Sequence, residues 1–477
     1  MSGLHRNLID GVWVDGEAAP NISPSDLGDV VGHYARATRA DTEAAIAAAR
    51  RAFPAWSRSG PLQRHAVLRR AADEILARKD DLGRLLSREE GKTLAEAVGE
   101  VTRAAQVFDF FAGEALRLTG ETVPSLRPGV GVEVTREAVG VVGLITPWNF
   151  PIAIPSWKIA PALCHGNTVV FKPADLVPGS AWALVDILDR AGLPKGVLNL
   201  VMGRGSVVGQ TILDSPDIDA VSFTGSTATG RRVAAASAER MRRFQLEMGG
   251  KNPLVVLDDA DLAVAVDCAV NGAFFSTGQR CTASSRLIVT EGIHDRFVAA
   301  LTEALKGLVV DHALKDGTHI GPVVDESQLA QDERYIALGQ DEGARLVFGG
   351  ERLVRGTPGH YLRPALFTEV TNSMRIAREE IFGPVAGVIR VKDYDEALAV
   401  ANDTPFGLSA GICTTSLKHA THFKRNAEAG MVMVNLATAG VDFHVPFGGR
   451  KGSSYGPREQ GRYAAEFYTT VKTAYTG

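Results

Sequence analysis

The order of hydrophobic and polar residues along the chain predicts helices first and strands later. Acidic and capping residues at 41–43 begin an alanine-rich helix that Pro54 should end. Further helical segments are predicted over 62–86 and 94–118. These three helices precede any strongly apolar strand.

Strand patterns follow the helices. Residues 131–139 alternate between valine and polar side chains, and four apolar runs then alternate with helix-like segments. This spacing predicts βαβ units, a parallel sheet and an α/β fold. A fifth apolar strand over 253–257 precedes a second α/β series over 261–434, and segment 467–475 is typical of an edge strand or of one shared with a partner. The four apolar runs span 141–146, 168–172, 197–202 and 220–224.

Composition and charge narrow the class of protein. The chain has 477 residues, of which 45% are hydrophobic, so we expect several globular domains rather than disorder. A net charge of −4 lacks the basic excess of nucleic-acid-binding proteins. The four cysteines form no CxxC pair and the histidines no HExxH, so no metal site is predicted.

The sequence also argues against membrane insertion. Three prolines interrupt the apolar stretch 141–157, which suits a strand and a buried loop better than a membrane span. Residues 1–16 lack the apolar core of a signal peptide. We therefore expect a cytoplasmic protein with neither a membrane nor a nucleic-acid partner.

Polar residues at the strand ends are candidates for ligand binding, because parallel sheets bind ligands at the carboxyl ends of their strands. Gly225 and Ser226 end a strand and open a helix, whose free N–H groups suit a phosphate; a helix cap without a ligand is the alternative. Lys172 and Asp175 follow another strand, where they could hold the ribose hydroxyls of a dinucleotide or form a surface salt bridge.

Two residues are candidates for catalysis. Cys281 follows glycine and polar residues, so it should be more exposed than Cys268 and Cys413, and the adjacent Arg280 should favour its thiolate; a small core cysteine is the alternative. Glu247 lies between leucine and methionine and precedes two glycines. Partial burial would raise its pKa and suit it to general-base work, whereas a solvated glutamate is the other interpretation.

Seven motifs contain these residues and occur in a characteristic order. Through them the chain resembles the NAD(P)-dependent aldehyde dehydrogenase superfamily over essentially its whole length. The motifs are Pro-Trp-Asn-Phe-Pro at 147–151, Lys-Pro-Ala-Asp at 172–175, Phe-Thr-Gly-Ser at 223–226, Glu-Met-Gly-Gly-Lys at 247–251, Gly-Gln-Arg-Cys at 278–281, Glu-Ile-Phe-Gly-Pro at 380–384 and Pro-Phe-Gly-Gly-Arg-Lys at 446–451.

The resemblance implies a thiol mechanism with a nicotinamide cofactor. Cys281 would be the nucleophile, Glu247 the general base and Asn149 an oxyanion donor. The family usually has glutamate at Asp175; the shorter carboxylate should still bind a ribose diol and repel a 2′-phosphate, so NAD is expected, with NADP as the alternative. Cofactor contacts are implied at Thr146, Trp148, Lys172, Asp175, Gly225, Ser226, Glu380 and Phe382.

The resemblance also implies three structural units. A Rossmann-like cofactor domain would comprise 1–119 and 140–249, with 450–463 packed near it. A catalytic α/β domain would comprise 250–449. Segments 120–139 and 464–477 would form a small β flap that joins copies of the chain into a homodimer or homotetramer.

The expected substrate is a small aldehyde whose identity is less constrained. Succinic-semialdehyde members usually carry arginine at Trp157, so that carboxylate clamp is missing, and Trp157, Phe150 and Phe443 would line an apolar tunnel. Arg103 and Arg280 could still bind a distal carboxylate. Alternatively, Arg103 lies on a solvated helix face, and Arg280 is a partner of the thiolate or of a structural group. Segment 438–459 resembles bacterial α-ketoglutaric semialdehyde (2,5-dioxopentanoate) dehydrogenases.

Four alternatives to a semialdehyde acid dehydrogenase of this kind stay open. They are a broad aliphatic or aromatic aldehyde dehydrogenase, a succinic semialdehyde dehydrogenase, a CoA-acylating enzyme and a non-catalytic protein on the same scaffold. Glu247 favours hydrolysis over acylation of CoA. The presence of Cys281 and Asn149 together with Glu247 argues against a non-catalytic protein.

Overall fold

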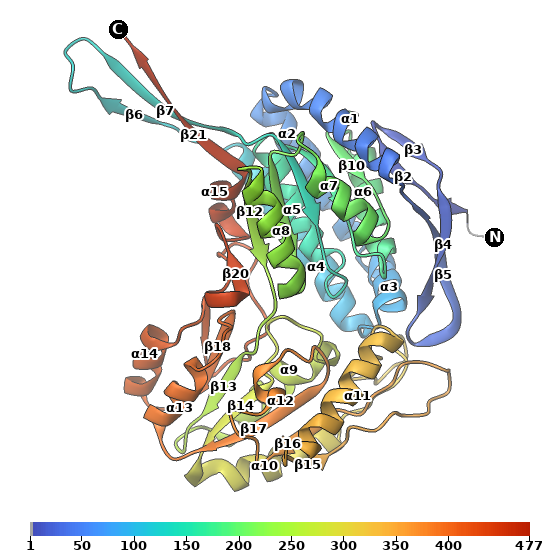
Figure 1. The fold of residues 1–477 in the computed structure, drawn as a ribbon, viewed down its shortest axis with the longest axis vertical. Coiled ribbons are helices and arrows are strands. Elements are labelled where there is room, and N and C mark those ends of the chain that lie inside the picture. Colours follow the sequence, from blue (N-terminus) through green and yellow to red (C-terminus); the bar gives the residue numbers. More distant parts are fainter. Residues whose placement is uncertain (1–2) are drawn as a thin grey trace.

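The computed structural model describes residues 3–477, which form two large sheets and two three-stranded sheets. Figure 1 shows helices packed around both large sheets and an arm that extends from the upper half of the molecule. The predicted α/β class is therefore confirmed.

The first large sheet has five parallel strands at its centre. The series begins in the middle, where β8 (Val141–Ile145) lies beside β11 (Ala220–Thr224) and the strand order changes direction. Open α/β sheets bind ligands at such a switch point, outside the carboxyl ends of the strands. In spatial order the strands are β20 (Ser454–Tyr455), β12 (Arg243–Glu247), β11, β8, β9 (Thr168–Lys172), β10 (Leu198–Leu200), β2 (Asn7–Ile9) and β3 (Val12–Val14), of which β20, β2 and β3 pair in antiparallel fashion.

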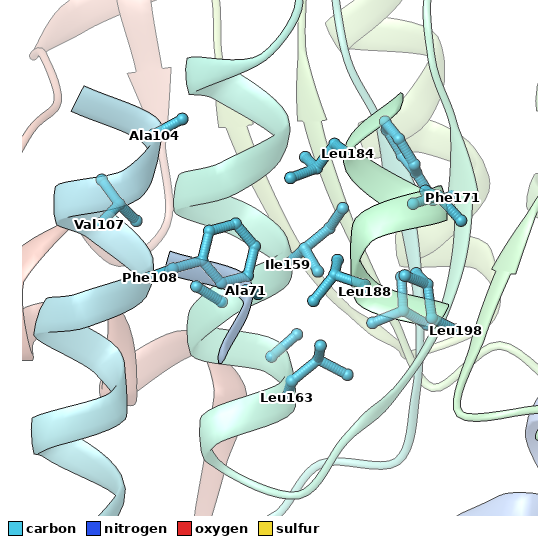
Figure 2. Close-up of a cluster of buried hydrophobic side chains, with 14 of the residues drawn as sticks. Ala71, Ala104, Val107, Phe108, Ile159, Leu163, Phe171, Leu184, Leu188 and Leu198 are labelled. Carbon is cyan, nitrogen blue, oxygen red and sulfur yellow. The ribbon is translucent and has the colours of Figure 1, made fainter. Parts of the chain in front are cut away.

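Helices cover both faces of this sheet. Adjacent β8 residues point to opposite layers, because Val142 packs in one apolar cluster and Val141 in another. Figure 2 shows the first cluster, where Phe108, Ile159 and Leu184 meet from three helices. Helices that contribute to it include α2 (Pro61–Ala77), α4 (Leu94–Ala115), α5 (Ala153–Cys164) and α6 (Pro178–Arg190), and the second cluster includes α1 (Arg39–Ser57), α7 (Gln210–Asp214) and α8 (Thr227–Glu239).

The second large sheet is parallel except for one edge strand, and it too is covered on both faces. It contains the predicted second α/β series. In spatial order its strands are β15 (Arg345–Phe348), β16 (Ala365–Thr368), β17 (Val385–Val391), β14 (Arg286–Thr290), β13 (Pro253–Val256), β18 (Ser409–Cys413) and β19 (Met431–Val434). One face carries α9 (Leu262–Ala273) and α10 (Glu291–Lys306), and the other carries α11 (Glu326–Asp341), α12 (Arg375–Arg378), α13 (Tyr394–Asn402) and α14 (Leu417–Asn426).

The predicted helices form, with corrections. The segment 94–118 is confirmed as α4, whose capping box pairs Thr93 with Glu96. The segment 62–86 is not one helix, because Arg78 leaves the helical conformation between α2 and α3 (Lys79–Glu90). Within residues 3–477 no helix is both long enough and apolar enough to cross a membrane.

Two predictions near the amino terminus need correction. Pro54 does not end α1, which continues to Ser57; buried Trp56 anchors this last turn in the core and offsets the hydrogen bond that proline removes. Strands also precede α1, although none was predicted there. They are β1 (Leu4–His5), β2, β3, β4 (Glu17–Ser23) and β5 (Asp26–Arg36), of which β1, β5 and β4 form a separate sheet.

The arm in Figure 1 is an antiparallel sheet of β6 (Glu121–Pro124), β7 (Gly131–Ala138) and β21 (Thr469–Thr476). β21 begins two residues later than predicted, because Phe467 and Tyr468 belong to α15 (Ala465–Tyr468) and are fully buried. Most other arm residues are exposed, including Val471 and Tyr475.

Candidate active site

Cys281 lies in a tight loop before β14. Ser276, Thr277 and Gly278 all have left-handed backbone conformations, with φ of 51°, 57° and 65°. At Gly278 a Cβ atom would lie 2.2 Å from the carbonyl oxygen of Gly383, so only glycine fits. The loop leaves Cys281 partly exposed through a pocket, whereas Cys268 and Cys413 are buried, as predicted, and so is Cys164.

The surroundings of the Cys281 thiol favour its protonated form. Its burial deep in the pocket raises its pKa to about 12, and the carboxylates of Glu380 and Glu247 add to the rise. The Arg280 cation does favour a Cys281 thiolate, since a charged Cys281 raises the pKa of Arg280, but burial of the thiol outweighs this effect. The Arg280 guanidinium lies 3.3 Å from Glu96 and donates to Ser276 Oγ at 2.9 Å. The thiol proton must therefore leave when the sulfur attacks.

Asn149 follows β8 and is held against the Cys281 loop. Its Nδ2 donates to the carbonyl oxygen of Gln279 at 3.0 Å, and the side chain is buried. Because an amide nitrogen carries two hydrogens, one is left to donate to a ligand. The backbone carbonyl oxygen of Asn149 accepts a hydrogen bond from Lys92, whose Nζ lies 2.8 Å from Glu100. The structure thus brings the predicted oxyanion donor against the loop that carries the predicted nucleophile.

Glu247 ends β12 and is only 2% exposed, so its predicted burial is confirmed. Its Oε2 accepts a hydrogen bond from Ser454 Oγ at 2.5 Å. Burial raises the pKa of Glu247 to about 8, and nearby Glu459 adds to the rise. A carboxyl with this pKa can exchange protons with water near neutral pH.

A buried ion pair close to Glu247 was not predicted. Lys158 and Glu459 are fully buried and in direct contact, and Lys158 Nζ donates to Ser222 Oγ at 2.7 Å. The pair is separated by 301 positions in the sequence, so no local pattern connects its members. One signal was available, because Lys158 is the only charged residue of α5, whose residues are all buried. A buried lysine usually requires a partner.

The predicted cofactor residues of the first sheet lie together at the switch point, and we call this surface the switch-point edge. Ser226 caps α8 by accepting from the Thr229 N–H at 3.4 Å. The hydroxyls of Thr146 and Thr224 are buried and have no hydrogen-bond partner in the described part of the chain. Free hydroxyls beside a helix amino terminus suit a phosphorylated ligand. The edge comprises Thr146, Lys172, Asp175, Gly225 and Ser226.

One end of the switch-point edge carries three charged residues. Lys172 is buried, which lowers its pKa to about 8, while Asp175 acts in the opposite direction. Arg36 was not predicted to belong here; it ends β5, and its guanidinium lies 3.6 Å from the Asp175 carboxylate. No strand was predicted over β5, so nothing in the sequence placed Arg36 at this edge.

The remaining predicted cofactor residues connect this edge to the Cys281 loop. Glu380 accepts from the Gly250 N–H at 2.9 Å, and a Cβ atom at Gly249 would lie 2.1 Å from its carboxylate. Burial raises the pKa of Glu380 to about 7. The rings of Trp148 and Phe382 meet edge to face, 5.4 Å apart. The site therefore lies where strand ends of the first sheet meet loops that precede β14 and β17.

A pocket of about 400 Å³ leads to Cys281, and we call it the Cys281 pocket. The predicted residues Phe150 and Trp157 line it, and Trp157 stacks on Phe447 at 5.4 Å. Phe443 is not a lining residue; it packs edge to face against Phe110, 6.2 Å away.

Both predicted cations reach the Cys281 pocket but differ in their partners. Arg280 is engaged by Glu96, Ser276 and the Asn271 carbonyl oxygen. The Arg103 guanidinium lines the pocket, and within residues 3–477 it makes no side-chain hydrogen bond and no ion pair within 4 Å. Burial lowers its pKa, with Asp442 acting in the opposite direction. Arg103 is thus the cation available to a ligand.

The chain belongs to the aldehyde dehydrogenase family, whose sequence profile matches residues 13–474. It is therefore an oxidoreductase that acts on aldehydes. The chain is 44% identical to the α-ketoglutaric semialdehyde dehydrogenase of Bacillus subtilis, over 99% of this chain and 98% of that protein. The α-ketoglutarate semialdehyde dehydrogenase of Haloferax volcanii is also 44% identical, over 100% and 99%.

A solved structure supports the same fold. The NAD⁺ complex of betaine aldehyde dehydrogenase from Staphylococcus aureus superposes with a TM-score of 0.96. The two sequences are 35% identical, and the match covers 99% of this chain and 95% of that one. The predicted aldehyde-dehydrogenase fold is confirmed.

Proposed function

We propose that this enzyme oxidises α-ketoglutaric semialdehyde (2,5-dioxopentanoate) to the dicarboxylic acid, with NAD as the preferred cofactor and NADP as the alternative. The relatives at 44% identity carry the name of this activity. The observation that carries the proposal is the Arg103 guanidinium, which faces the Cys281 pocket without a protein partner. Burying a substrate carboxylate is costly unless a cation meets it.

The switch-point edge would hold the cofactor, which accepts a hydride when bound. Ser226 and the amino end of α8 suit the pyrophosphate, and Lys172 with Asp175 suits the adenosine ribose. Glu380 and Phe382 lie toward Cys281 and suit the nicotinamide end. The unpartnered buried hydroxyl of Thr146 fits this assignment, since a bound ligand would satisfy it.

The residues around Cys281 fit a two-stage oxidation. The sulfur attacks the aldehyde carbon and loses its proton to solvent through the open pocket, while the Asn149 amide and the Cys281 N–H donate to the developing oxyanion. After hydride transfer a thioester links the substrate to Cys281. Glu247 then takes a proton from the water that hydrolyses the thioester, and the acid leaves. A hydrolytic base of this kind favours a free acid over a CoA thioester as the product.

The finer organisation is also part of the proposal. The units 1–119 with 140–249, 250–449 and 120–139 with 464–477 would be the cofactor domain, the catalytic domain and the flap. The exposed arm would join copies of the chain into a homodimer or homotetramer in the cytoplasm, which light scattering of the purified protein would test.

Arg103→Met tests the substrate assignment. Because a charge-assisted hydrogen bond contributes roughly 1.5–3 kcal/mol, KM for 2,5-dioxopentanoate should rise about ten- to a hundredfold. Reduced-cofactor absorbance would be followed with this acid and with pentanal. Gln106→Met is a matched control, because Gln106 lies on the same helix but is exposed.

The outcomes separate the proposal from its competitors. A rise in KM for the acid but not for pentanal supports Arg103 as the carboxylate anchor. Equal effects on both substrates, or none, would remove Arg103 from that role. A wild type that prefers pentanal is a broad-specificity enzyme, and one that prefers succinic semialdehyde acts on the shorter acid.

A further inference from the structure

Gln460 is a buried amide that lines the Cys281 pocket without a protein partner. The residue is 1% exposed, and neither Nε2 nor Oε1 has a hydrogen-bond partner in the described part of the chain. Its backbone is also left-handed, with φ of 62°, although it is not glycine. Buried polar groups are nearly always paired, and strained residues persist where surrounding structure holds them, often for function.

The neighbours of Gln460 fix it in this position. Glu459 exchanges both backbone hydrogen bonds with Phe447, at 2.8 and 2.9 Å, and its side chain contacts buried Lys158. On the other side, the Gly461 N–H donates to the Phe443 carbonyl oxygen at 3.3 Å. The backbone on both sides of Gln460 is therefore held in place.

A second unpartnered donor lies in the same pocket. Trp157 Nε1 is buried without a hydrogen-bond partner, and the indole ring stacks on Phe447, which pairs with the residue before Gln460. The pocket thus offers two neutral donors in addition to the Arg103 cation. A 2-oxo acid presents a ketone oxygen beside its carboxylate, and this oxygen can accept hydrogen bonds from such donors. A substrate with a plain hydrocarbon chain would leave both donors unpaired.

We infer that Gln460 and Trp157 are specificity residues that donate hydrogen bonds to the 2-oxo group of the substrate, while Arg103 pairs with its carboxylate. This inference rests on the proposed function and deepens it. Sites with buried polar groups discriminate against analogues that leave those groups unpaired. The enzyme should therefore favour 2,5-dioxopentanoate over 5-oxopentanoate, which has the same length and carboxylate but lacks the ketone.

The test is the ratio of kcat/KM for these two acids in the full-length enzyme. In Gln460→Met the ratio should fall about tenfold, mainly through KM for the ketone-bearing acid, and in Trp157→Phe it should fall by a smaller factor. Val441→Ala is the matched control, because Val441 lines the same pocket without a hydrogen-bonding side chain. It should change both substrates by similar factors and leave the ratio near the wild-type value.

Each result supports or overturns the inference. A Gln460→Met ratio equal to wild type, in a protein that melts normally, overturns it. If that variant does not fold, an unchanged ratio in Trp157→Phe overturns it instead. A wild type that prefers acids to pentanal but does not distinguish the two acids refutes only the hypothesis that Gln460 and Trp157 recognise the 2-oxo group. A wild type that prefers pentanal refutes the proposed function itself.

Discussion

The switch-point edge and the Cys281 pocket are built in different ways, although both serve one site. The edge consists of residues that directly follow parallel strands, so local sequence positions Gly225 and Ser226. The pocket is lined by side chains from distant segments, such as Arg103, Trp157 and Gln460. Cofactor binding therefore depends on strand topology, whereas aldehyde recognition depends on tertiary contacts that can change without disturbing the sheet.

Cys281→Ala should separate the two regions most completely. Aldehyde oxidation should fall by more than about a thousandfold, because no other group replaces the nucleophile. Cofactor binding, followed by quenching of tryptophan fluorescence, should persist. Cys268→Ala is the control, since Cys268 is buried in α9 away from the pocket. Substantial oxidation by Cys281→Ala would reject the mechanism.

Glu247→Gln should stop the reaction after hydride transfer, because an amide cannot take a proton from water. Rapid mixing should show a burst of at most one reduced cofactor per site, followed by turnover slowed about 10²–10⁴-fold. Undiminished steady-state turnover would mean that another group activates water.

The pH dependence should follow the same carboxylate. Since Glu247 acts as a base only when deprotonated, and its pKa is raised to about 8, hydrolysis should accelerate as the pH rises from 6 to 9. The burst amplitude reports the earlier step and serves as the internal comparison. A pH profile of turnover that is flat across this range would contradict the role.

Lys158→Met tests the buried ion pair of Lys158 with Glu459, which lies next to the Cys281 pocket. It leaves the Glu459 carboxylate buried without its cation, which costs about 3–5 kcal/mol, so the melting temperature should drop by several degrees. The double variant Lys158→Met/Glu459→Gln should recover much of the loss, because it removes both charges. Equal melting of the single and double variants would show that the charges are not coupled.

Asp175→Ser should have the smallest effect, and this effect should be limited to the cofactor preference that the switch-point edge determines. Removing this carboxylate frees Arg36 and takes away a negative charge that would repel the 2′-phosphate of NADP. The kcat/KM with NADP relative to that with NAD should therefore rise about tenfold. Arg36→Met should shift the ratio in the opposite direction. A wild type that already prefers NADP would contradict our interpretation of Asp175.

Sequence reasoning succeeded where local pattern determines position. Strand periodicity located β8, β9 and β11, and residues at or just after their carboxyl ends form the edge. It did not reveal the ion pair of Arg280 with Glu96, because adjacency along the chain does not decide where a side chain points. It also missed the Lys158–Glu459 pair, whose members meet only in the folded chain.

Ser454, Glu459 and Gln460 all come from one short segment near the end of the chain, which emerges late when the protein is synthesised. A ribosome adds roughly 5–20 residues per second, so the loop of Cys281 exists for about ten seconds or longer before that segment emerges. During this interval Glu247 lacks its hydroxyl partner, the buried lysine lacks its counter-charge and the pocket lacks a wall. A nascent chain therefore carries the reactive sulfur without the means to complete a turnover, and activity arises only when the late segment docks.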